Sequence, residues 1–416
     1  MKQSQFSKLP LPEKPQLNLG YMRLVDSAPI LVAKELGYFD RYGLTVDLHR
    51  EISWANIRDK VIAGVFDAGH MLAPMPLVTT LGAAGIRAPM LTGLMLSLNG
   101  NGITVTPLLW EKMQSLYDGA LSSEDPLATA QALARVVEDG GESDKLTFAT
   151  VHHFSTHTLL LRLWLKAAGV DPDQQLKIIV LPPEQMVDSL ASGLIDGFCV
   201  GEPWNSVAVS CGAGIMATTG YQVWNNAPEK VLGVLEHWHA KHPATHLRLR
   251  LALMEACKWL SVAENRVQAI DIMSSCDYLD LPKEYFLPSM SGNILFDRNQ
   301  APREHASFQV FSQYNAGFPW RSQAEIILRQ CSEQLGKPIE ENRLVSLTQQ
   351  CYRTDLYREA ARHLGWPSPF KDHKPEGKHD APWQFSEDIT LGSDFMLAPH
   401  IDAAGEFSEA NVGAPK

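Results

Sequence analysis

Strand-like and helix-like runs alternate along the first half of this sequence, and that order permits few folds. Alternating apolar residues at 44–49 are followed by Ser53, a residue type that caps helix N-termini, and then by a helical run through Ile62. A strand-like run at 146–151 likewise precedes a helical run at 156–168, and another follows at 195–200. Strands that alternate with helices predict an α/β fold whose parallel sheet is covered on both faces.

The length of 416 residues is too great for one compact core, so two lobes are expected. Residues 102–204 repeat the strand–helix order and are predicted to form a second α/β lobe. This lobe would be inserted into the first lobe, which is made of residues 1–101 and 205–416, and two chain crossings would form a hinge. Mostly helical patterns after the insertion predict a helical C-terminal extension, which ends in a loop-like tail rich in Pro, Gly, Asp and His.

Charge and composition exclude several kinds of protein. The net charge of -11 argues against a nucleic-acid surface, because phosphate contacts need clustered Lys and Arg. No apolar run is long enough to cross a membrane, and residues 1–10 lack the apolar stretch of a secretory signal. The six cysteines have no disulfide or metal spacing, as in a reduced cytosolic protein. We therefore expect a cytoplasmic location.

Known catalytic and cofactor motifs are missing from the sequence. It contains neither a phosphate-binding loop of the G-x-x-x-x-G-K-[ST] type nor a G-x-S-x-G nucleophile motif. Four histidines cluster at 237–246, but Pro243 interrupts their helical spacing and no cysteine or carboxylate completes a ligand set. We expect no metal, no cofactor and no enzymatic activity.

Polar residues lie at junctions where a ligand would bind an α/β fold. Ligands of such folds bind at the carboxyl ends of strands, where helix N-termini present unpaired N–H groups. Trp54 and His157 each lie at such a strand-to-helix junction, and both side chains can donate hydrogen bonds. Each also has an ordinary alternative role: Trp54 can fill the core, and His157 can pack against its loop or cap the helix.

Several segments resemble the solute-binding proteins of nitrate and bicarbonate ABC transporters. The matching segments, which run in the family's order, are GFCVGEPWN at 197–205, SWA at 53–55, TH at 156–157, PILVAKELGYF at 29–39, MLAPMP at 71–76, PWRS at 319–322 and YREAA at 357–361. The resemblance extends over residues 17–365 and implies a two-lobed, periplasmic-binding-protein-like (type II) fold. It is closest to the cytoplasmic nitrate/nitrite sensors (NasS-like) of that family.

The resemblance also implies an anion site. The family's ligand-binding positions correspond to Trp54, Asn101, His157, Gly201 and Lys230. Taken alone, Lys230 would be a solvated surface residue, but nitrate-binding relatives carry an anion-pairing lysine at the corresponding place. Bicarbonate-binding relatives instead use an acidic residue and a metal there. Relatives usually have Gln where this chain has Asn101, so its shorter amide would contact the ligand less directly or through water.

The function expected from the resemblance is a sensor of nitrate or nitrite. Ligand-free sensors of this type hold an RNA-binding antiterminator protein with an ANTAR domain, and the anion releases it to control nitrate-assimilation genes. The alternative is a substrate-binding receptor that delivers the anion to an ABC transporter. A third possibility is an enzyme, since pyrimidine-precursor synthases share the lobed fold, but it would require a cofactor.

Overall fold

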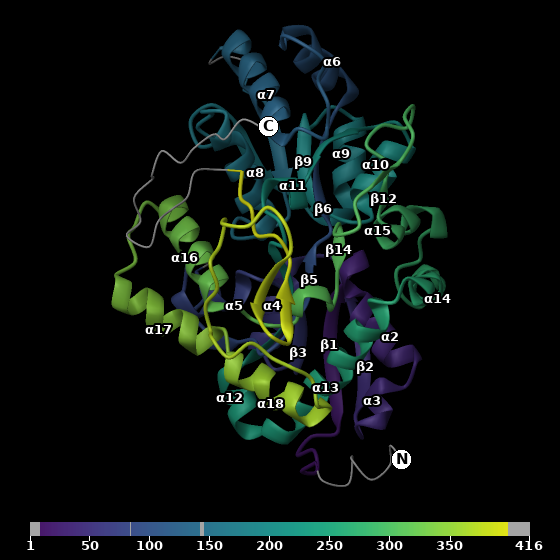
Figure 1. Cartoon of the computed structure of the whole chain (residues 1–416), viewed down its shortest axis with the longest axis vertical. Coiled ribbons are helices and arrows are strands. Elements are labelled where there is room, and N and C mark those ends of the chain that lie inside the picture. The colour runs from purple at the N-terminus through teal and green to yellow at the C-terminus, as the bar shows by residue number, and fades with distance from the viewer. Residues whose placement is uncertain (1–8, 84, 142–144, 398–416) are drawn as a thin grey trace.

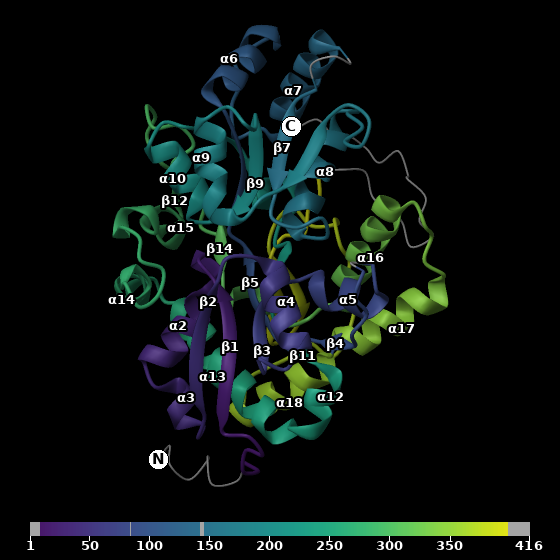
Figure 2. The same ribbon diagram turned by 180° about the vertical axis from the view of Figure 1, so that it is seen from behind.

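The computed structural model describes residues 9–83, 85–141 and 145–397. They form two lobes, each built on its own sheet, which lie one above the other (Figure 1) and are seen from behind in Figure 2. Residues 1–8, which carry most of the segment judged to lack a secretory signal, lie outside the described residues. So does the end of the predicted tail at 398–416.

The first lobe contains a seven-stranded mixed sheet. Its strands are β1 (Gln16–Met22), β2 (Thr45–Glu51), β3 (Ala68–Leu72), β4 (Met90–Leu91), β5 (Met95–Asn99), β11 (Pro228–Leu235) and β14 (Gln309–Val310). The order is β14-β5-β11-β3-β1-β2, with β4 paired to β11. The predicted parallel pairing holds for β1 with β2 and β3, whereas β11 pairs antiparallel with both β3 and β5.

The second lobe contains a five-stranded sheet in the order β10-β6-β9-β7-β8. Its strands are β6 (Asn101–Val105), β7 (Thr147–Thr150), β8 (Lys177–Val180), β9 (Gly197–Gly201) and β10 (Ile215–Thr219). Strand β10 lies beyond residue 204, at which the sequence pattern ended this lobe, yet it pairs antiparallel with β6. The return to the first lobe therefore comes between β10 and β11. The sequence pattern missed this because β10 is short and adds to the sheet edge only after an intervening helix.

Helices cover the sheets and build the C-terminal extension. Those of the first lobe before the insertion are α2 (Ala28–Glu35), α3 (Tyr38–Arg41), α4 (Trp54–Ile62) and α5 (Met75–Leu81). Those of the second lobe are α6 (Pro107–Leu116), α7 (Pro126–Gly140), α8 (Thr156–Ala167), α9 (Met186–Ala191), α10 (Trp204–Ser210) and α11 (Gly220–Val223). The extension contains α12 (Glu236–Lys241), α13 (Pro243–Leu260), α14 (Ala263–Ser274), α15 (Leu287–Ser291), α16 (Arg321–Leu335), α17 (Glu341–Cys351) and α18 (Thr354–Leu364). Within the described ranges, no helix is long and apolar enough to cross a membrane.

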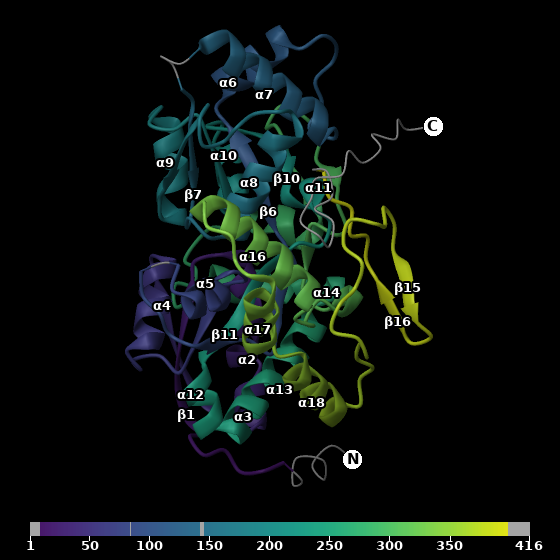
Figure 3. The ribbon, with the colours of Figure 1, turned by 90° about the vertical axis from the view of Figure 1, so that its left-hand side faces the viewer.

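Short 3-10 helices and two small hairpins complete the chain. The 3-10 helices are η1 (Val25–Ser27), η2 (Pro183–Gln185), η3 (Lys283–Tyr285) and η4 (Gln313–Asn315). The hairpins pair β12 (Asn293–Ile294) with β13 (Arg303–Glu304), and β15 (Trp383–Ser386) with β16 (Ile389–Leu391). The β15–β16 hairpin stands on the outside of the molecule, away from the two main sheets (Figure 3).

The two helices that begin at the lobe boundary are capped by serine side chains. Ser53 has extended backbone angles, and its Oγ accepts a hydrogen bond from the amide of Asn56 at 3.2 Å. Ser155 caps α8 in the same way by accepting from the amide of Thr158 at 3.1 Å. These caps fix where α4 and α8 begin, so Trp54 and His157 lie in the first helical turns. The predicted cap at Ser53 is confirmed.

The C-terminal extension contacts both lobes. Strand β14 pairs with the end of β5, where Gln309 lies opposite Asn99. The Met216 amide of the second lobe donates to the Phe296 carbonyl at 2.9 Å, and Lys166 on α8 forms an ion pair with Glu333 on α16. The extension therefore bridges the lobes instead of covering the first lobe alone.

Close packing at Gly100, where the chain first crosses between the lobes, can be tested by substitution. Gly100 has a φ of 78°, and a Cβ there would collide with the Gln309 side chain on β14. Gly64 has a similar φ of 73° but has no atom within 4 Å of such a Cβ. Gly64→Ala should cost about 1 kcal/mol for the left-handed backbone. Gly100→Ala should cost a further ~1–3 kcal/mol through overpacking. Urea unfolding measures both variants, and equal losses would contradict the crowded crossing.

Candidate functional site

The five predicted site residues come from both lobes and meet at one buried place. Trp54 lies on α4 and Lys230 on β11 of the first lobe, whereas Asn101 on β6, His157 on α8 and Gly201 on β9 belong to the second lobe. The side chains of Trp54, Asn101, His157 and Lys230 are at most 1% exposed. The predicted convergence is therefore present, while their role in binding a ligand stays a prediction.

Lys230 is the only lysine among the described residues that is fully buried. Its Nζ lies 2.6 Å from Oδ2 of Asp26 and forms a second ion pair with Oε1 of Glu229. The same ammonium lies 5.2 Å from the centroid of the Trp54 ring, close enough for a cation–π interaction. A charge that is removed from water needs such partners.

Glu229 connects the first lobe to the second. Its Oε2 accepts a hydrogen bond from Asn101 Nδ2 at 2.7 Å, and its Oε1 lies 3.0 Å from His157 Nε2. Glu229 and Lys230 are adjacent in β11, so a regular strand would direct them to opposite faces. The register of β11 against β5 shifts on both sides of Lys230, and this irregularity is the physical reason why both side chains reach the same site.

Asp26 and His70 form the other side of the site. Asp26 belongs to η1, just beyond the carboxyl end of β1, and its Oδ1 lies 3.2 Å from Nε2 of His70 on β3. The amide of Met22 donates to His70 Nδ1 at 3.5 Å, which assigns the ring proton to Nε2. The His70 and Trp54 rings meet edge to face, with centroids 5.4 Å apart.

The sequence analysis missed Asp26, His70 and Glu229 as site residues. The signal for Asp26 was present, because it follows a parallel strand at its carboxyl end, where ligands bind. His70 lay inside a strand-like run and Glu229 beside a predicted site lysine, and strand alternation would have excluded Glu229. Only the irregular β11 register places it in the site.

Several polar atoms of this site are buried without a hydrogen-bond partner among the described residues. Among them are Trp54 Nε1, Asn101 Oδ1 and both ring nitrogens of His157, whose contact with Glu229 is close but not aligned as a hydrogen bond. Buried polar atoms in proteins are nearly always paired, so a cluster of unpaired ones indicates a ligand site. Two of these groups, the Trp54 indole and the His157 ring, are donors.

Gly201 lies between Asp26 and His157. A Cβ at this position would lie 3.5 Å from Asp26 Oδ2 and 3.6 Å from His157 Nε2, both ordinary van der Waals distances. An alanine would therefore fit against the protein atoms but would occupy space beside the unpaired imidazole. The close approach of backbone and ligand at Gly201 stays a prediction.

The electrostatics of the site depend on burial and on one ammonium. Burial by itself would raise the pKa of Asp26, but Lys230 and His70 outweigh it and lower that pKa to about 2. Burial opposes the charge on Lys230, yet Asp26 and Glu229 raise its pKa above the ordinary value. Asp26 and Lys230 are therefore an ion pair at neutral pH.

The pKa values of two further groups near the ammonium, Glu229 and His157, are shifted toward their neutral forms. Burial raises the pKa of Glu229 to about 7, although Lys230 acts in the opposite direction. Burial and the Lys230 charge lower the pKa of His157 well below its ordinary value. The His157 ring is therefore a neutral imidazole, which can donate one hydrogen bond, and Glu229 exchanges its proton near neutral pH.

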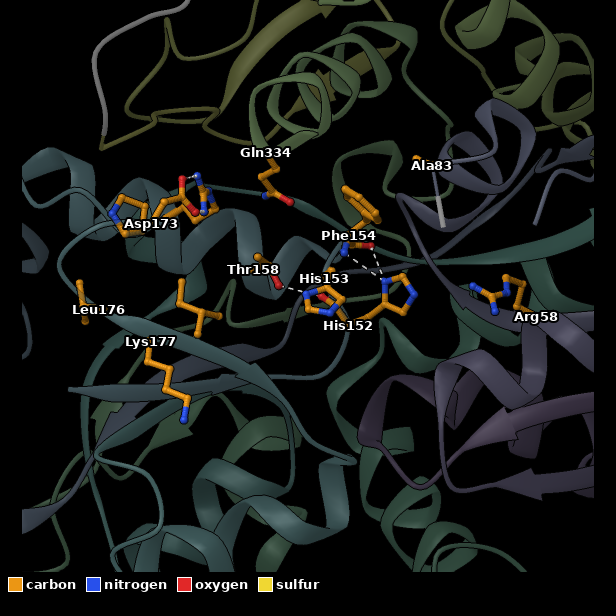
Figure 4. A pocket seen from close by; sticks show the side chains of 13 residues that line it. Arg58, Ala83, His152, His153, Phe154, Thr158, Asp173, Leu176, Lys177 and Gln334 are labelled. Atoms are coloured by element: carbon orange, nitrogen blue, oxygen red, sulfur yellow. Dashed lines mark hydrogen bonds and ion pairs between the residues drawn. The ribbon is translucent and has the colours of Figure 1, made fainter. Parts of the chain in front are cut away.

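An open cavity of about 720 Å³ adjoins the lobe boundary (Figure 4). The start of α8 and its preceding loop form one wall, and Arg58 approaches from α4. Its lining side chains are those of Arg58, Ala83, His152, His153, Phe154, Thr158, Arg162, Pro172, Asp173, Leu176, Lys177, Ile178 and Gln334. Cationic groups predominate, but Asp173 already pairs with Arg162 at 2.6 Å, and none of the five predicted site residues lines this cavity.

The histidines near 237–246 do not form a metal site in the described structure. His239 and His246 contact each other through their Nδ1 atoms at 3.0 Å. Throughout residues 9–83, 85–141 and 145–397, no group of three or more His, Cys, Asp or Glu is arranged to hold a metal ion.

Sequence comparisons place this chain among known binding proteins. Residues 11–274 match the NMT1-like family. The chain is 30% identical over 367 residues to the nitrate/nitrite binding protein NrtA of Synechocystis sp., which covers 86% of this chain and 78% of that protein. It is also 39% identical over 364 residues to the nitrate import ATP-binding protein NrtC of the same organism, covering 87% of this chain and 52% of NrtC. The chain thus spans about half the length of NrtC.

Solved structures agree with the fold. The crystal structure of the periplasmic nitrate-binding protein NrtA from Synechocystis superimposes with a TM-score of 0.79 at 29% identity, over 92% of this chain and 97% of that one. A zinc-bound ligand-binding component of an ABC-type import system from Staphylococcus aureus, at 17% identity and a TM-score of 0.62, shares the fold alone. The predicted α/β, two-lobed fold is confirmed. The chain therefore belongs to the NMT1-like family, among the solute-binding proteins of nitrate and bicarbonate transporters, which are binding proteins and not enzymes.

Proposed function

We propose that this protein is a receptor for nitrate or nitrite, which binds between the two lobes. The observation that carries the proposal is the meeting of a buried ammonium, Lys230, with two buried donors that lack partners, Trp54 Nε1 and the His157 ring. Charge-assisted hydrogen bonds to an anion would satisfy these donors. The names of the relatives, nitrate/nitrite binding protein and nitrate import ATP-binding protein, supply the ligand class.

The proposed ligand is small, flat and singly charged. Trp54 and His157 offer ring surfaces and one N–H each, which suit a weakly hydrated planar anion. The site has a single ammonium, and Asp26 already neutralises it. A divalent anion would bring a second, uncompensated charge into a buried place, which is costly.

For the biological role, we propose a cytoplasmic sensor that holds an ANTAR-domain antiterminator and releases it when the anion binds. The proposal derives from the sequence resemblance, and it is compatible with a ligand that bridges two lobes and so changes their equilibrium. A transport receptor is the second candidate. The relatives named as nitrate-binding and nitrate-import proteins favour it.

A panel of anions tests the ligand. Isothermal titration near neutral pH should give saturable binding of nitrate and nitrite at one site per chain, and no binding of sulfate. Bicarbonate should bind more weakly, because Lys230 favours an anion that need not donate a hydrogen bond. Tight binding of sulfate with no response to nitrate or nitrite would contradict the proposed ligand.

A matched pair of histidine variants tests the location of the site. His157→Ala should weaken nitrate binding by about 10- to 100-fold, since a hydrogen bond to a charged group contributes ~1.5–3 kcal/mol. His239→Ala should leave the affinity unchanged, because this half-buried residue contacts His246 and lies outside the site. Titration of both variants measures the difference. Equal affinities would exclude His157 from the site.

Fractionation and complex formation separate the two biological roles. A sensor should be recovered with the cytoplasmic proteins and should co-elute with the antiterminator on gel filtration only when nitrate and nitrite are absent. Recovery outside the cytoplasm, or nitrate-dependent association with a membrane permease, would favour the transport receptor. Both experiments use buffers without bicarbonate, which would compete with nitrate for the site.

A further inference from the structure

The carboxylate of Glu229 lies against three side chains that an incoming anion would need. Its Oε1 pairs with Lys230 and lies 3.0 Å from His157 Nε2, while its Oε2 accepts from Asn101 Nδ2 at 2.7 Å. Lys230, His157 and Asn101 are three of the five residues predicted to bind the ligand. An ionised Glu229 is therefore a competitor of the anion for the same groups.

The charged and titratable groups that face Glu229 come from five elements. Lys230 lies beside it on β11, His157 reaches it from α8, and Asp26 approaches from η1. Cys199 on β9 and His70 on β3 complete the set. The charge of Glu229 acts on the Cys199 thiol, and His70 contacts Asp26. The Cys199 thiol is fully buried, and burial raises its pKa well above the ordinary value, so it stays neutral.

Near neutral pH, the net charge of Glu229 and the five groups that face it depends on the protonation of Glu229 alone. Lys230 and Asp26 cancel, and burial lowers the pKa of both His70 and His157, which leaves their rings neutral. With Glu229 ionised the group is singly negative, and a monovalent anion would make it doubly negative. With Glu229 protonated the group is neutral, and the anion restores only the original single charge. Because the site is fully buried, anion binding with Glu229 protonated is strongly favoured over binding with Glu229 ionised.

We propose that the anion binds to this site together with one proton, which Glu229 takes up from the buffered solvent. This inference rests on the proposed nitrate or nitrite ligand. The proton goes to a carboxylate oxygen of Glu229, which weakens its ion pair with Lys230 and its close contact with His157 Nε2. Lys230 and His157 become available to the anion, and the neutral carboxyl can donate to it. The O–H bond of Glu229 forms as a buffer acid gives up its proton and becomes its conjugate base, and no other covalent bond changes.

The protonation equilibrium of the free site supports this coupling. Burial raises the pKa of Glu229 to about 7, so the proton is exchanged in the physiological range. An anion beside the carboxyl raises that pKa further, because a like charge disfavours ionisation. Above the pKa of the free site, binding must therefore consume a proton. Affinity should then fall by about tenfold for each pH unit.

Glu202 provides a matched control for this coupling. It is also buried, and burial raises its pKa to about 7 despite its hydrogen bonds to Ser206 and Asn205. Its Oε2 accepts from the Ser206 amide at 3.2 Å, and no contact with Lys230, His157 or Asn101 is found among its described interactions. Glu202→Gln therefore removes a similar buried carboxyl without freeing the anion donors.

The test is nitrate titration calorimetry of the full chain at about pH 8, in phosphate and in Tris. These buffers differ in ionisation enthalpy, so the difference in observed heat gives the number of protons taken up. We expect about one proton per nitrate for the unaltered protein and for Glu202→Gln. For Glu229→Gln we expect none, together with an affinity that no longer changes with pH.

The outcomes separate this inference from the proposed function. Nitrate binding without proton uptake by the unaltered protein would overturn the inference and leave the function intact, whether or not any variant folds. Proton uptake that persists in Glu229→Gln, or that disappears in Glu202→Gln, would assign the proton elsewhere and overturn it as well. Absence of nitrate and nitrite binding at every pH would overturn the proposed function, and with it this inference.

Discussion

The structure around the lobe boundary depends on one buried ammonium. Lys230 is removed from water and is held by Asp26 of η1 and by its neighbour Glu229. Removing one partner of a buried ion pair leaves the other charge unpaired and typically costs ~3–5 kcal/mol. A well-packed apolar side chain would serve stability at least as well, so stability gives little reason for a lysine here. The indole and imidazole nitrogens beside it lack hydrogen-bond partners, and the proposed anion would supply them.

The same ammonium is linked to the contacts between the lobes through Glu229. Glu229, which pairs with Lys230, also contacts His157 and Asn101 of the second lobe. Backbone contacts reinforce this junction, because Thr156 Oγ1 donates to the Pro228 carbonyl at 2.7 Å and the Val25 amide donates to the Glu202 carbonyl at 2.8 Å. Contacts at the site are therefore contacts between lobes. The proposed change of charge on Glu229 would therefore alter contacts between the lobes.

Most of the fold could be predicted from the sequence, and so could five of the eight residues that meet at the site. The strand–helix order predicted the α/β lobes, and Ser53 predicted the start of α4, because both signals are local. The lobe boundary at residue 204 left out β10, since a five-residue strand that returns to a distant partner carries little local signal. Trp54, Asn101, His157, Gly201 and Lys230 were identified largely through resemblance to known binding proteins. Nothing in their spacing alone required them to meet.

The sequence by itself determined many of the elements and the capped helix start at Ser53, because backbone preferences and apolar periodicity act over a few residues. Only the tertiary structure decided that Asp26, His70 and Glu229 share the site with Lys230. Strand alternation directs Glu229 away from the face used by Lys230, and the irregular pairing of β11 with β5 brings both to it. The balance of charges in the site, and hence its dependence on protons, arises from pairings between residues that are far apart in the chain.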